Sequence, residues 1–284
     1  MTFAGKYGPW AIVVGASAGL GASFAEGCAR RGLNVALVAR RTEPLEAMAA
    51  DIAERHSVET RALPGDAAQP DFTETLAAAT AGLDLGLLIY NCAGEHSGPF
   101  LEMAAADFQD NIRINCLTPT LIAQTFGRRL VVRGRGGLVF VTSKSALRGW
   151  PGWVSYSASK AYEMLLGEGL WGELRPHGID AHTYVVGSTY TPAYIQMQKD
   201  LDTPFANSID PKDYPPGTRL PRPPETVAET MFPLLGTAPR LYSHAEDEAD
   251  ALAFAQRPRA EVVADANPLY ATAIKASLAP AGFL

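Results

Sequence analysis

The segment Trp10-Ala-Ile-Val-Val14 runs directly into Gly15-Ala-Ser-Ala-Gly19-Leu-Gly21, and this junction decides the fold. Five apolar residues in a row are typical of a fully buried strand, and the glycines predict a tight turn. Residues 22–31 then have helical character. A glycine turn between a buried strand and a helix lets a phosphate approach free backbone N–H groups. The spacing Gly-x3-Gly-x-Gly differs from the common dinucleotide fingerprint, so a turn needed only for packing is the alternative. The position of the turn favours a nucleotide site.

Strand-like and helix-like segments alternate through most of the chain. The strand-like segments are continuous apolar runs, which is typical of a parallel sheet covered on both faces. We therefore predict an α/β fold, a doubly wound parallel sheet of the Rossmann type, in one domain over residues 1–284. Predicted strands cover 10–14, 34–39, 58–63, 85–90, 137–142 and 179–186, with a possible edge strand at 240–243. Predicted helices cover 22–31, 43–55, 72–81, 104–115, 119–133, 155–175, 225–235 and 246–256.

Residues 188–224 differ in character from the rest of the chain. This stretch is rich in proline and aromatic residues and has little periodicity. A long irregular segment within a compact domain is commonly a lid or a binding loop, and we predict a substrate lid here. A disordered insertion is the alternative, although the aromatic residues favour packing.

Composition narrows the class of protein. The chain has 284 residues, of which 47% are hydrophobic and 19% charged, and its net charge of −6 argues against a nucleic-acid partner. Its three cysteines have no spacing typical of disulfides or metal ligands, so we expect a cytoplasmic protein without a metal. The uncharged run 8–25 contains four glycines and a proline, so we interpret it as a strand and turn. We expect no transmembrane segment and no signal peptide.

Two arginines end the second predicted strand, in Val38-Ala39-Arg40-Arg41. Proteins that bind NAD usually place an acidic residue there, beside the 2′-hydroxyl of the adenosine ribose. A guanidinium group instead suits a 2′-phosphate, so Arg40 and Arg41 predict NADP(H) as the cofactor. Two solvated arginines at a helix start are the alternative, although the helix dipole disfavours cations there.

Tyr156 and Lys160 form a second chemical signal. They lie four residues apart in a predicted helix, so both side chains are expected on one face. A nearby ammonium favours the phenolate, and we therefore expect the pKa of Tyr156 to be lowered toward neutrality. Such a tyrosine can give or accept a proton. Ser143 precedes it by thirteen residues, at the end of a predicted strand.

In this order the motifs resemble the short-chain dehydrogenase/reductase family, in its single-domain branch. The resemblance rests on the glycine turn, Asp66, Asn91-Cys-Ala-Gly94, Asn115, Ser143 and Tyr156-Ser-Ala-Ser-Lys160, and it spans residues 8–192. The openings Lys6-Tyr-Gly-Pro-Trp-Ala and Arg31-Gly-Leu-Asn-Val-Ala-Leu also resemble the group of 17β-hydroxysteroid dehydrogenases and long-chain 3-oxoacyl reductases. The family implies hydride transfer between NADP(H) and a small-molecule ketone or alcohol.

The resemblance also implies a role for each matching residue. Tyr156 would be the general acid/base, and Lys160 would hold the nicotinamide ribose and lower the pKa of the tyrosine. Ser143 would orient the substrate oxygen, and Asn115 would position a water in a proton relay. The family further implies a homodimer or homotetramer packed through helices 119–133 and 155–175. The implied cofactor contacts are Gly15, Ser17, Ala18, Gly19, Leu20, Gly21, Arg40, Arg41, Asp66, Asn91, Ala93, Gly94, Tyr156, Lys160, Gly187, Thr189 and Thr191.

Aromatic residues near the predicted site suggest a bulky, apolar substrate such as a steroid, an aromatic ketone or a 3-oxoacyl compound. Ordinary loop packing is the alternative for the tryptophans. The candidate substrate residues are Glu95, Trp150, Trp153, Tyr190 and Tyr194. A lyase or dehalogenase, or a non-catalytic nucleotide sensor on the same fold, would be expected to lose the glycine turn, Ser143 or Tyr156, all of which are present.

Some positions depart from the family pattern or are unusual, among them Val186, which stands where the family has a proline. Val14 and Tyr90 stand where the family has a threonine and an asparagine. Lys144 directly follows Ser143, and we interpret it as a structural or solvated lysine.

Overall fold

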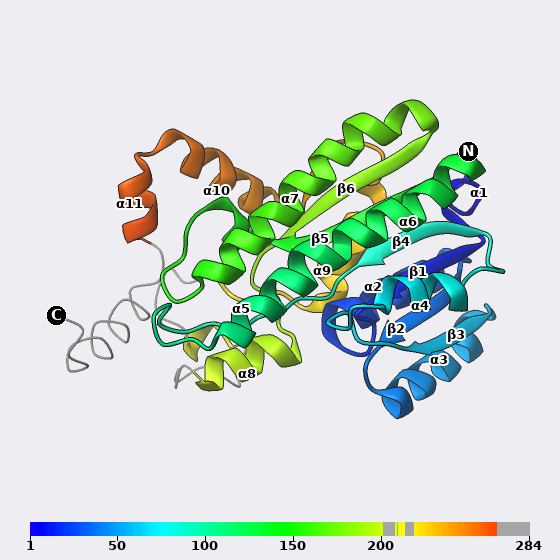
Figure 1. Cartoon of the computed structure of the whole chain (residues 1–284), viewed down its shortest axis with the longest axis horizontal. Coiled ribbons are helices and arrows are strands. Elements are labelled where there is room, and N and C mark those ends of the chain that lie inside the picture. The colour runs from blue at the N-terminus through cyan, green and yellow to red at the C-terminus, as the bar shows by residue number, and fades with distance from the viewer. Residues whose placement is uncertain (201–207, 209, 214–218, 266–284) are drawn as a thin grey trace.

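The computed structural model describes residues 1–200, 208, 210–213 and 219–265. Within them, seven parallel strands form one sheet in the order β3-β2-β1-β4-β5-β6-β7 (Figure 1). The strands are β1 (Trp10–Val14), β2 (Asn34–Ala39), β3 (Thr60–Pro64), β4 (Leu85–Tyr90), β5 (Gly136–Ser143), β6 (Ile179–Val186) and β7 (Arg240–Tyr242). This confirms the predicted doubly wound sheet, including the edge strand.

The central strands are buried on both faces because their side chains alternate between two cores. Along β1, Ala11 and Val13 belong to one cluster and Ile12 and Val14 to the other. The first core is completed by α2 (Gly19–Arg30), α3 (Thr42–His56) and α9 (Pro224–Met231). The second is completed by α4 (Phe72–Ala79), α6 (Thr118–Arg133) and α7 (Val154–Leu174). Two covered faces explain why the strands are continuous apolar runs.

The order of the strands reverses between β1 and β4, and the segments that follow these two strands lie together. The Asn91 N–H donates to the Val14 carbonyl at 2.9 Å, and the Asn91 side-chain amide donates to the Gly15 carbonyl at 3.4 Å. Ligands of open α/β sheets bind at such a switch point, beyond the carboxyl ends of the strands.

Residues 104–133 differ from the two separate helices predicted there. Helix α5 (Ala105–Ile112) continues through a π-helical turn, Arg113–Leu117, into α6 without a break. Three helices were not predicted: α1 (Phe3–Tyr7), α8 (Pro192–Asp200) and α11 (Arg259–Ala264). Helix α10 (Ala245–Gln256) follows β7 as predicted, and α5, α8, α10 and α11 lie on the left of Figure 1, far from α1.

The two ends of the predicted lid are joined to each other by backbone hydrogen bonds. The Tyr190 N–H donates to the Arg222 carbonyl at 2.8 Å, and the Arg222 N–H donates to the Ser188 carbonyl at 2.9 Å. Between these ends, the described residues form α8 and the 3₁₀ turn Pro211–Asp213. Residues 201–207, 209 and 214–218 of this stretch, and the C-terminal residues 266–284, lie outside the described residues.

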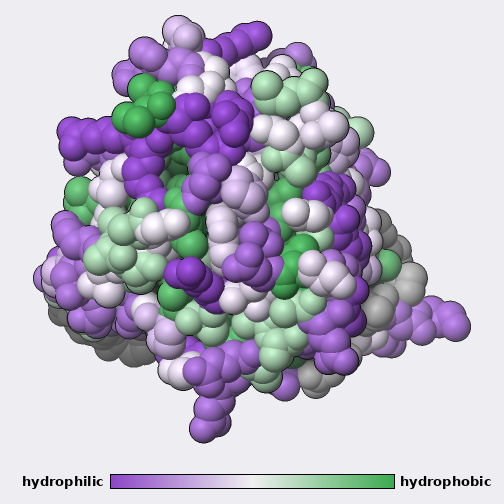
Figure 2. Space-filling view, turned by 90° about the vertical axis from the view of Figure 1, so that its right-hand side faces the viewer, coloured by the Kyte–Doolittle hydropathy of each residue, from purple (hydrophilic) through white to green (hydrophobic). Residues whose placement is uncertain are grey.

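The surface seen in Figure 2 is largely hydrophilic, with small hydrophobic patches between the hydrophilic residues. No helix in the described part of the chain is long and apolar enough to cross a membrane.

Candidate active site

The glycine turn after β1 is shaped for close backbone approach. Gly15 and Gly19 have positive φ angles of 85° and 53°. A Cβ at Gly21 would lie 1.9 Å from the Gly15 carbonyl oxygen, so only glycine fits there. Helix α2 begins at Gly19, and its N-cap residue Ala18 has no side chain that could cap the first N–H groups. These N–H groups fit a phosphate, and the turn therefore fits a nucleotide cofactor.

The loop after β6 lies directly against this turn. A Cβ at Gly19 would be 3.0 Å from the Thr191 side chain. The Thr191 hydroxyl accepts a hydrogen bond from the Tyr194 N–H at 3.1 Å, and the Thr189 hydroxyl donates to the Gly187 carbonyl at 3.1 Å. The structure thus brings two predicted cofactor segments, far apart in sequence, to one place.

Arg40 and Arg41 follow β2 with exposed side chains. Neither forms a hydrogen bond or ion pair with another residue that the structure describes. Asp66, beyond β3, accepts the Ala68 N–H at 3.0 Å, which fixes its carboxylate in the loop next to that strand. Among the described residues, neither guanidinium is occupied by an acidic partner, so both are available to an anionic ligand.

Asn115 is buried in the π-helical turn and holds the loop after β4. Its amide oxygen accepts the Gly94 N–H at 2.9 Å, and its amide nitrogen donates to the Gly94 carbonyl and to the Ser159 hydroxyl, both at 2.9 Å. The predicted asparagine therefore connects the Ala93-Gly94 loop to α7, the helix that carries Tyr156.

Tyr90 accounts for one departure from the family pattern. In the π-helical turn, Thr118 N–H bonds to the Arg113 carbonyl, five residues back. The next carbonyl in that register, Ile114, would need the N–H of residue 119, which is a proline. The Tyr90 hydroxyl supplies the missing donor at 2.6 Å. Tyr90 thus satisfies the backbone of the turn that positions Asn115.

Tyr156, Ser143 and Lys160 converge at the carboxyl end of β5. Tyr156 is 8% exposed, and Ser143 is the last residue of β5. The ring of Trp153 packs edge-on against Tyr156 with the centroids 5.2 Å apart. The Lys160 ammonium is buried and donates to the Val141 carbonyl at 3.0 Å.

The expected lowering of the pKa of Tyr156 is wrong in this structure. Burial, more than any other cause, raises the pKa of the phenol, and the charges of Glu95 and Glu163 raise it further. The nearby Ser143 and Ser145 hydroxyls act in the opposite direction. The Lys160 ammonium, which was expected to lower this pKa, is 2.7 Å from the Glu163 carboxylate. Sequence reasoning overlooked Glu163, although its i, i+3 spacing from Lys160 is visible in the sequence.

The predicted substrate residues divide into two sets. Glu95 lies in the loop after β4, where desolvation of its carboxyl by the surrounding protein raises the pKa and the charge of Lys160 opposes that rise. Trp153 contacts Tyr156. The rings of Tyr190 and Tyr194 lie 6.5 Å apart at the start of the predicted lid.

Trp150 belongs instead to a contact with α10. The Arg148 guanidinium lies 4.3 Å from the Trp150 ring centroid and 4.5 Å from that of Phe254. Arg148 therefore links Trp150 to α10. Among the described residues, no ring contact between Trp150 and Tyr156 is found, in contrast to Trp153.

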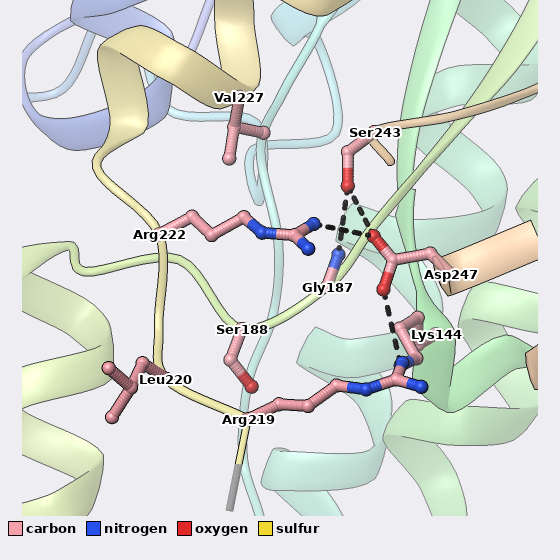
Figure 3. Close-up of a pocket in the computed structure, with 9 residues that line it drawn as sticks. All are labelled: Lys144, Gly187, Ser188, Arg219, Leu220, Arg222, Val227, Ser243 and Asp247. Atoms are coloured by element: carbon pink, nitrogen blue, oxygen red, sulfur yellow. Dashed lines mark hydrogen bonds and ion pairs between the residues drawn. The ribbon is translucent and has the colours of Figure 1, made fainter. Parts of the chain in front are cut away.

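A charged network behind Gly187 was also overlooked. Asp247 of α10 is buried, forms ion pairs with Lys144 and Arg222, and accepts a hydrogen bond from the Ser243 hydroxyl (Figure 3). Lys144 also pairs with Asp250 of α10. Lys144, Arg222, Ser243 and Asp247 line a small pocket beside Gly187. Lys144 therefore has structural partners, which agrees with the interpretation drawn from the sequence.

Comparison with known proteins decides the family. A profile of the family described as short chain dehydrogenase matches residues 9–202. The chain belongs to the short-chain dehydrogenase family. Over 213 residues, this short-chain dehydrogenase is 33% identical to the 7beta-hydroxysteroid dehydrogenase of Clostridium sardiniense, covering 75% of the chain and 82% of that relative. It is 35% identical over 200 residues to the very-long-chain 3-oxoacyl-CoA reductase of Podospora anserina, covering 69% of the chain and 58% of the relative.

Solved structures agree with this assignment. A structure of a 7beta-hydroxysteroid dehydrogenase superposes with a TM-score of 0.83 and 26% identity, covering 97% of the short-chain dehydrogenase chain and 100% of that structure. A short-chain dehydrogenase from Sphingobium yanoikuyae in complex with NADPH superposes with a TM-score of 0.73 and 26% identity, covering 92% and 97%. The predicted resemblance to hydroxysteroid dehydrogenases and 3-oxoacyl reductases is confirmed, although the steroid relatives named here are 7beta rather than 17β enzymes.

Proposed function

We propose that the protein is an NADP(H)-dependent oxidoreductase that interconverts a ketone and a secondary alcohol. One observation carries this proposal: Tyr156, Ser143 and Lys160 converge at the carboxyl end of β5, at the same edge of the parallel sheet as the glycine turn that follows β1, in a chain of the short-chain dehydrogenase family. A phenol and a hydroxyl at one place are what a carbonyl oxygen needs when it becomes an alkoxide.

The choice of NADP(H) rests on charge. Arg40 and Arg41 are exposed where the adenosine ribose of a bound dinucleotide is expected, and both lack partners among the described residues. A related short-chain dehydrogenase was solved with NADPH. A guanidinium group binds a phosphate by charge-assisted hydrogen bonds that a ribose hydroxyl cannot match.

The chemistry divides between the cofactor and the chain. When bound, the nicotinamide supplies or accepts the hydride. In ketone reduction the Tyr156 phenol gives its proton to the substrate oxygen, and the Ser143 hydroxyl donates a hydrogen bond to the same oxygen. Lys160 would hold the nicotinamide ribose of the bound cofactor. Asn115 fixes the Ala93-Gly94 loop, and we assign it to the path by which the proton is replaced.

A bulky and largely apolar substrate is the class that these residues favour. Trp153 beside the tyrosine and the pair Tyr190–Tyr194 offer aromatic contact. Similarity to hydroxysteroid dehydrogenases and 3-oxoacyl-CoA reductases supports the same class. We also assign residues 188–224, whose two ends pair through Ser188, Tyr190 and Arg222, as the lid over this substrate.

Replacing Tyr156 by phenylalanine tests the proposal. The purified protein is assayed by NADPH absorbance, in both directions, against a panel of 7-oxosteroids, other steroid ketones, aromatic ketones and 3-oxoacyl thioesters and the matching alcohols. For the substrate turned over, Tyr156→Phe is expected to lower kcat by about 10²- to 10⁴-fold, because the proton donor is lost.

NADPH affinity, followed by fluorescence titration, is expected to stay nearly unchanged in the variant, since the phenol is not needed to hold the nucleotide. Substantial turnover by Tyr156→Phe would refute the assigned proton donor. Failure of the wild-type protein to oxidise or reduce any of the panel, despite binding NADPH, would favour a non-catalytic nucleotide sensor.

A further inference from the structure

A buried carboxylate in the pocket beside Gly187 has no part in the proposed chemistry. Asp247 of α10 is 3% exposed. Its Oδ1 atom is 3.2 Å from the Lys144 ammonium, and its Oδ2 atom accepts the Ser243 hydroxyl at 2.6 Å and lies 3.6 Å from the Arg222 guanidinium. Both oxygens are therefore engaged, and Figure 3 shows the carboxylate pointing toward these three partners.

The first partner adjoins the strand end that carries Ser143. Lys144 directly follows Ser143 and is the first residue of a 3₁₀ turn, in which the Ser143 hydroxyl oxygen accepts the Ser145 N–H at 3.2 Å. In the sheet, Ser143 is paired in register with Val186 of β6. The ion pair between Lys144 and Asp247 therefore connects α10 to the backbone that presents the proposed oxygen-binding hydroxyl.

The second partner belongs to the junction where the two ends of the predicted lid meet. The Arg222 backbone is hydrogen-bonded to Ser188 and Tyr190. Its guanidinium forms ion pairs with Asp247 and, at 3.0 Å, with Glu246. The same carboxylate that contacts the end of β5 therefore also contacts the end of the lid.

The third partner connects Asp247 to the loop after β6. The Ser243 N–H donates to the Val185 carbonyl at 3.0 Å, and the Ser243 hydroxyl oxygen accepts the Gly187 N–H at 3.5 Å. Because the hydroxyl donates its proton to Asp247, its lone pairs are free to face Gly187. Gly187 is one of the predicted cofactor contacts.

Asp250 strengthens the same connection one helical turn along α10. It forms ion pairs with Lys144 and with Arg219. His244 is 3.9 Å from Asp247 and adds no charge near neutral pH, because burial lowers its pKa. Among the described side chains, three cations face three carboxylates, namely Lys144, Arg219, Arg222, Glu246, Asp247 and Asp250. The network therefore has no excess charge with which to bind an ionic ligand.

Stability alone does not explain a buried carboxylate at this place. The cost of removing a carboxylate and its cations from water roughly cancels the gain from pairing them, and packed apolar residues often stabilise a protein as well. Charge-assisted hydrogen bonds do add a defined geometry between the groups that they join. Two of the segments joined by Asp247 follow β5 and β6 at the carboxyl edge of the sheet, where ligands of such sheets bind.

We propose that Asp247 is a positioning residue for the reaction: through Lys144 it fixes the strand end that presents Ser143 to the substrate oxygen, and through Arg222 it fixes the end of the lid. This inference rests on the proposed function. The two connections have different kinetic consequences. The orientation of Ser143 matters most in the transition state and affects kcat, whereas the position of the lid affects substrate binding and KM.

Replacing each partner alone separates the two connections. Lys144→Met keeps an unbranched side chain and removes the charge. It is expected to lower kcat about tenfold with little change in KM, because a small misplacement of the Ser143 hydroxyl weakens its bond to the developing alkoxide. Arg222→Gln is expected to raise KM about two- to fivefold, the range of a partly exposed ion pair, with a smaller change in kcat. Steady-state kinetics with the best ketone of the panel, at saturating NADPH, measures both.

Asp247→Asn keeps the shape of the side chain and removes its charge, so it is expected to lower kcat and raise KM together. The double variant Lys144→Met/Asp247→Asn should have a kcat no lower than that of Asp247→Asn, since the two residues act as one unit. NADPH affinity, followed by fluorescence titration, should change little in every variant. The control is Glu248→Gln, which removes an exposed carboxylate from the same helix and should leave both constants unchanged.

A purely structural role would reduce the folded fraction, and with it kcat, in every variant alike and without a change in KM. That result, or kcat losses that multiply in the double variant, would overturn the inference. If Asp247→Asn does not fold, the contrast between Lys144→Met and Arg222→Gln decides in its place. The proposed function stands in each of these cases as long as Tyr156→Phe is inactive. A wild-type protein that turns over no ketone of the panel would remove both.

Discussion

Arg40 and Arg41 extend from the end of β2 without partners among the described residues. This isolation is informative because surface arginines in this chain commonly pair with acids, as Arg30 and Arg31 do with Glu229. An unpaired guanidinium beside a nucleotide turn is available to an anionic ligand.

Arg40→Ala is therefore expected to weaken NADPH binding roughly tenfold or more, since hydrogen bonds to charged groups contribute about 1.5–3 kcal/mol each. NADH affinity should change little, because its ribose carries no phosphate. Fluorescence titration with each nucleotide measures both. Arg128→Ala, at an exposed position on α6, is the control. Equal affinity of the wild-type protein for NADPH and NADH would contradict the role of Arg40.

At the same scale, the sequence predicted which side chains belong to the site but not their electrostatics. The spacing of Ser143, Tyr156 and Lys160 follows from strand and helix geometry, which local sequence determines. The pKa of Tyr156 depends on burial and on Glu95, which is distant in sequence. It depends as well on Glu163, whose buried orientation shows only once α7 is packed on the sheet.

Among the elements, the π-helical turn Arg113–Leu117 most directly affects the site. Sequence reasoning divided this region into two helices, because Pro119 normally ends the helix before it. The structure keeps one helix because the turn absorbs an extra residue and the proline falls near the start of α6. The Ile114 carbonyl, which lacks a backbone donor, accepts its hydrogen bond from Tyr90 on β4. Because Tyr90 is far from this helix in sequence, no local sequence pattern could have indicated the π-helical turn.

Tyr90→Phe is expected to lower the free energy of unfolding by about 1–3 kcal/mol, because the Ile114 carbonyl loses its donor in a buried place. Urea denaturation measures this change. The variant should also lose activity, since the turn positions Asn115 and through it Gly94. Tyr162→Phe, at an exposed tyrosine on α7 that contacts Thr120, is the matched control. A Tyr90→Phe variant as stable as the control would show that the turn holds without this bond.

At the scale of the whole molecule, α6 and α7 each expose large apolar side chains. Leu165 is 61% exposed, Val132 91% and Tyr162 44%. Apolar side chains gathered on neighbouring helices are typical of a protein–protein interface. They support the homodimer or homotetramer that we propose through these two helices.

A charge placed on that surface is expected to separate the subunits. Light scattering after size exclusion should show a dimer or tetramer for the wild-type protein and a smaller species for Leu165→Glu, because a carboxylate would be buried unpaired. Leu252→Glu on α10 has the same 61% exposure and should keep the wild-type mass. A wild-type monomer would remove the basis for this proposal.

The network around Asp247 bears on how this enzyme could be re-engineered. The family profile ends at residue 202, whereas α10 lies beyond it and pairs with Lys144, the neighbour of Ser143. The Asp247 carboxylate also crowds Gly187, because a Cβ at that position would lie only 2.9 Å from the Asp247 Oδ1 atom. The region that contains α10 therefore cannot be exchanged independently of the residues that it contacts. A chimera that takes this region from a relative would have to inherit residues 144, 187, 247 and 250 together, or the graft would disturb the strand end that presents the serine.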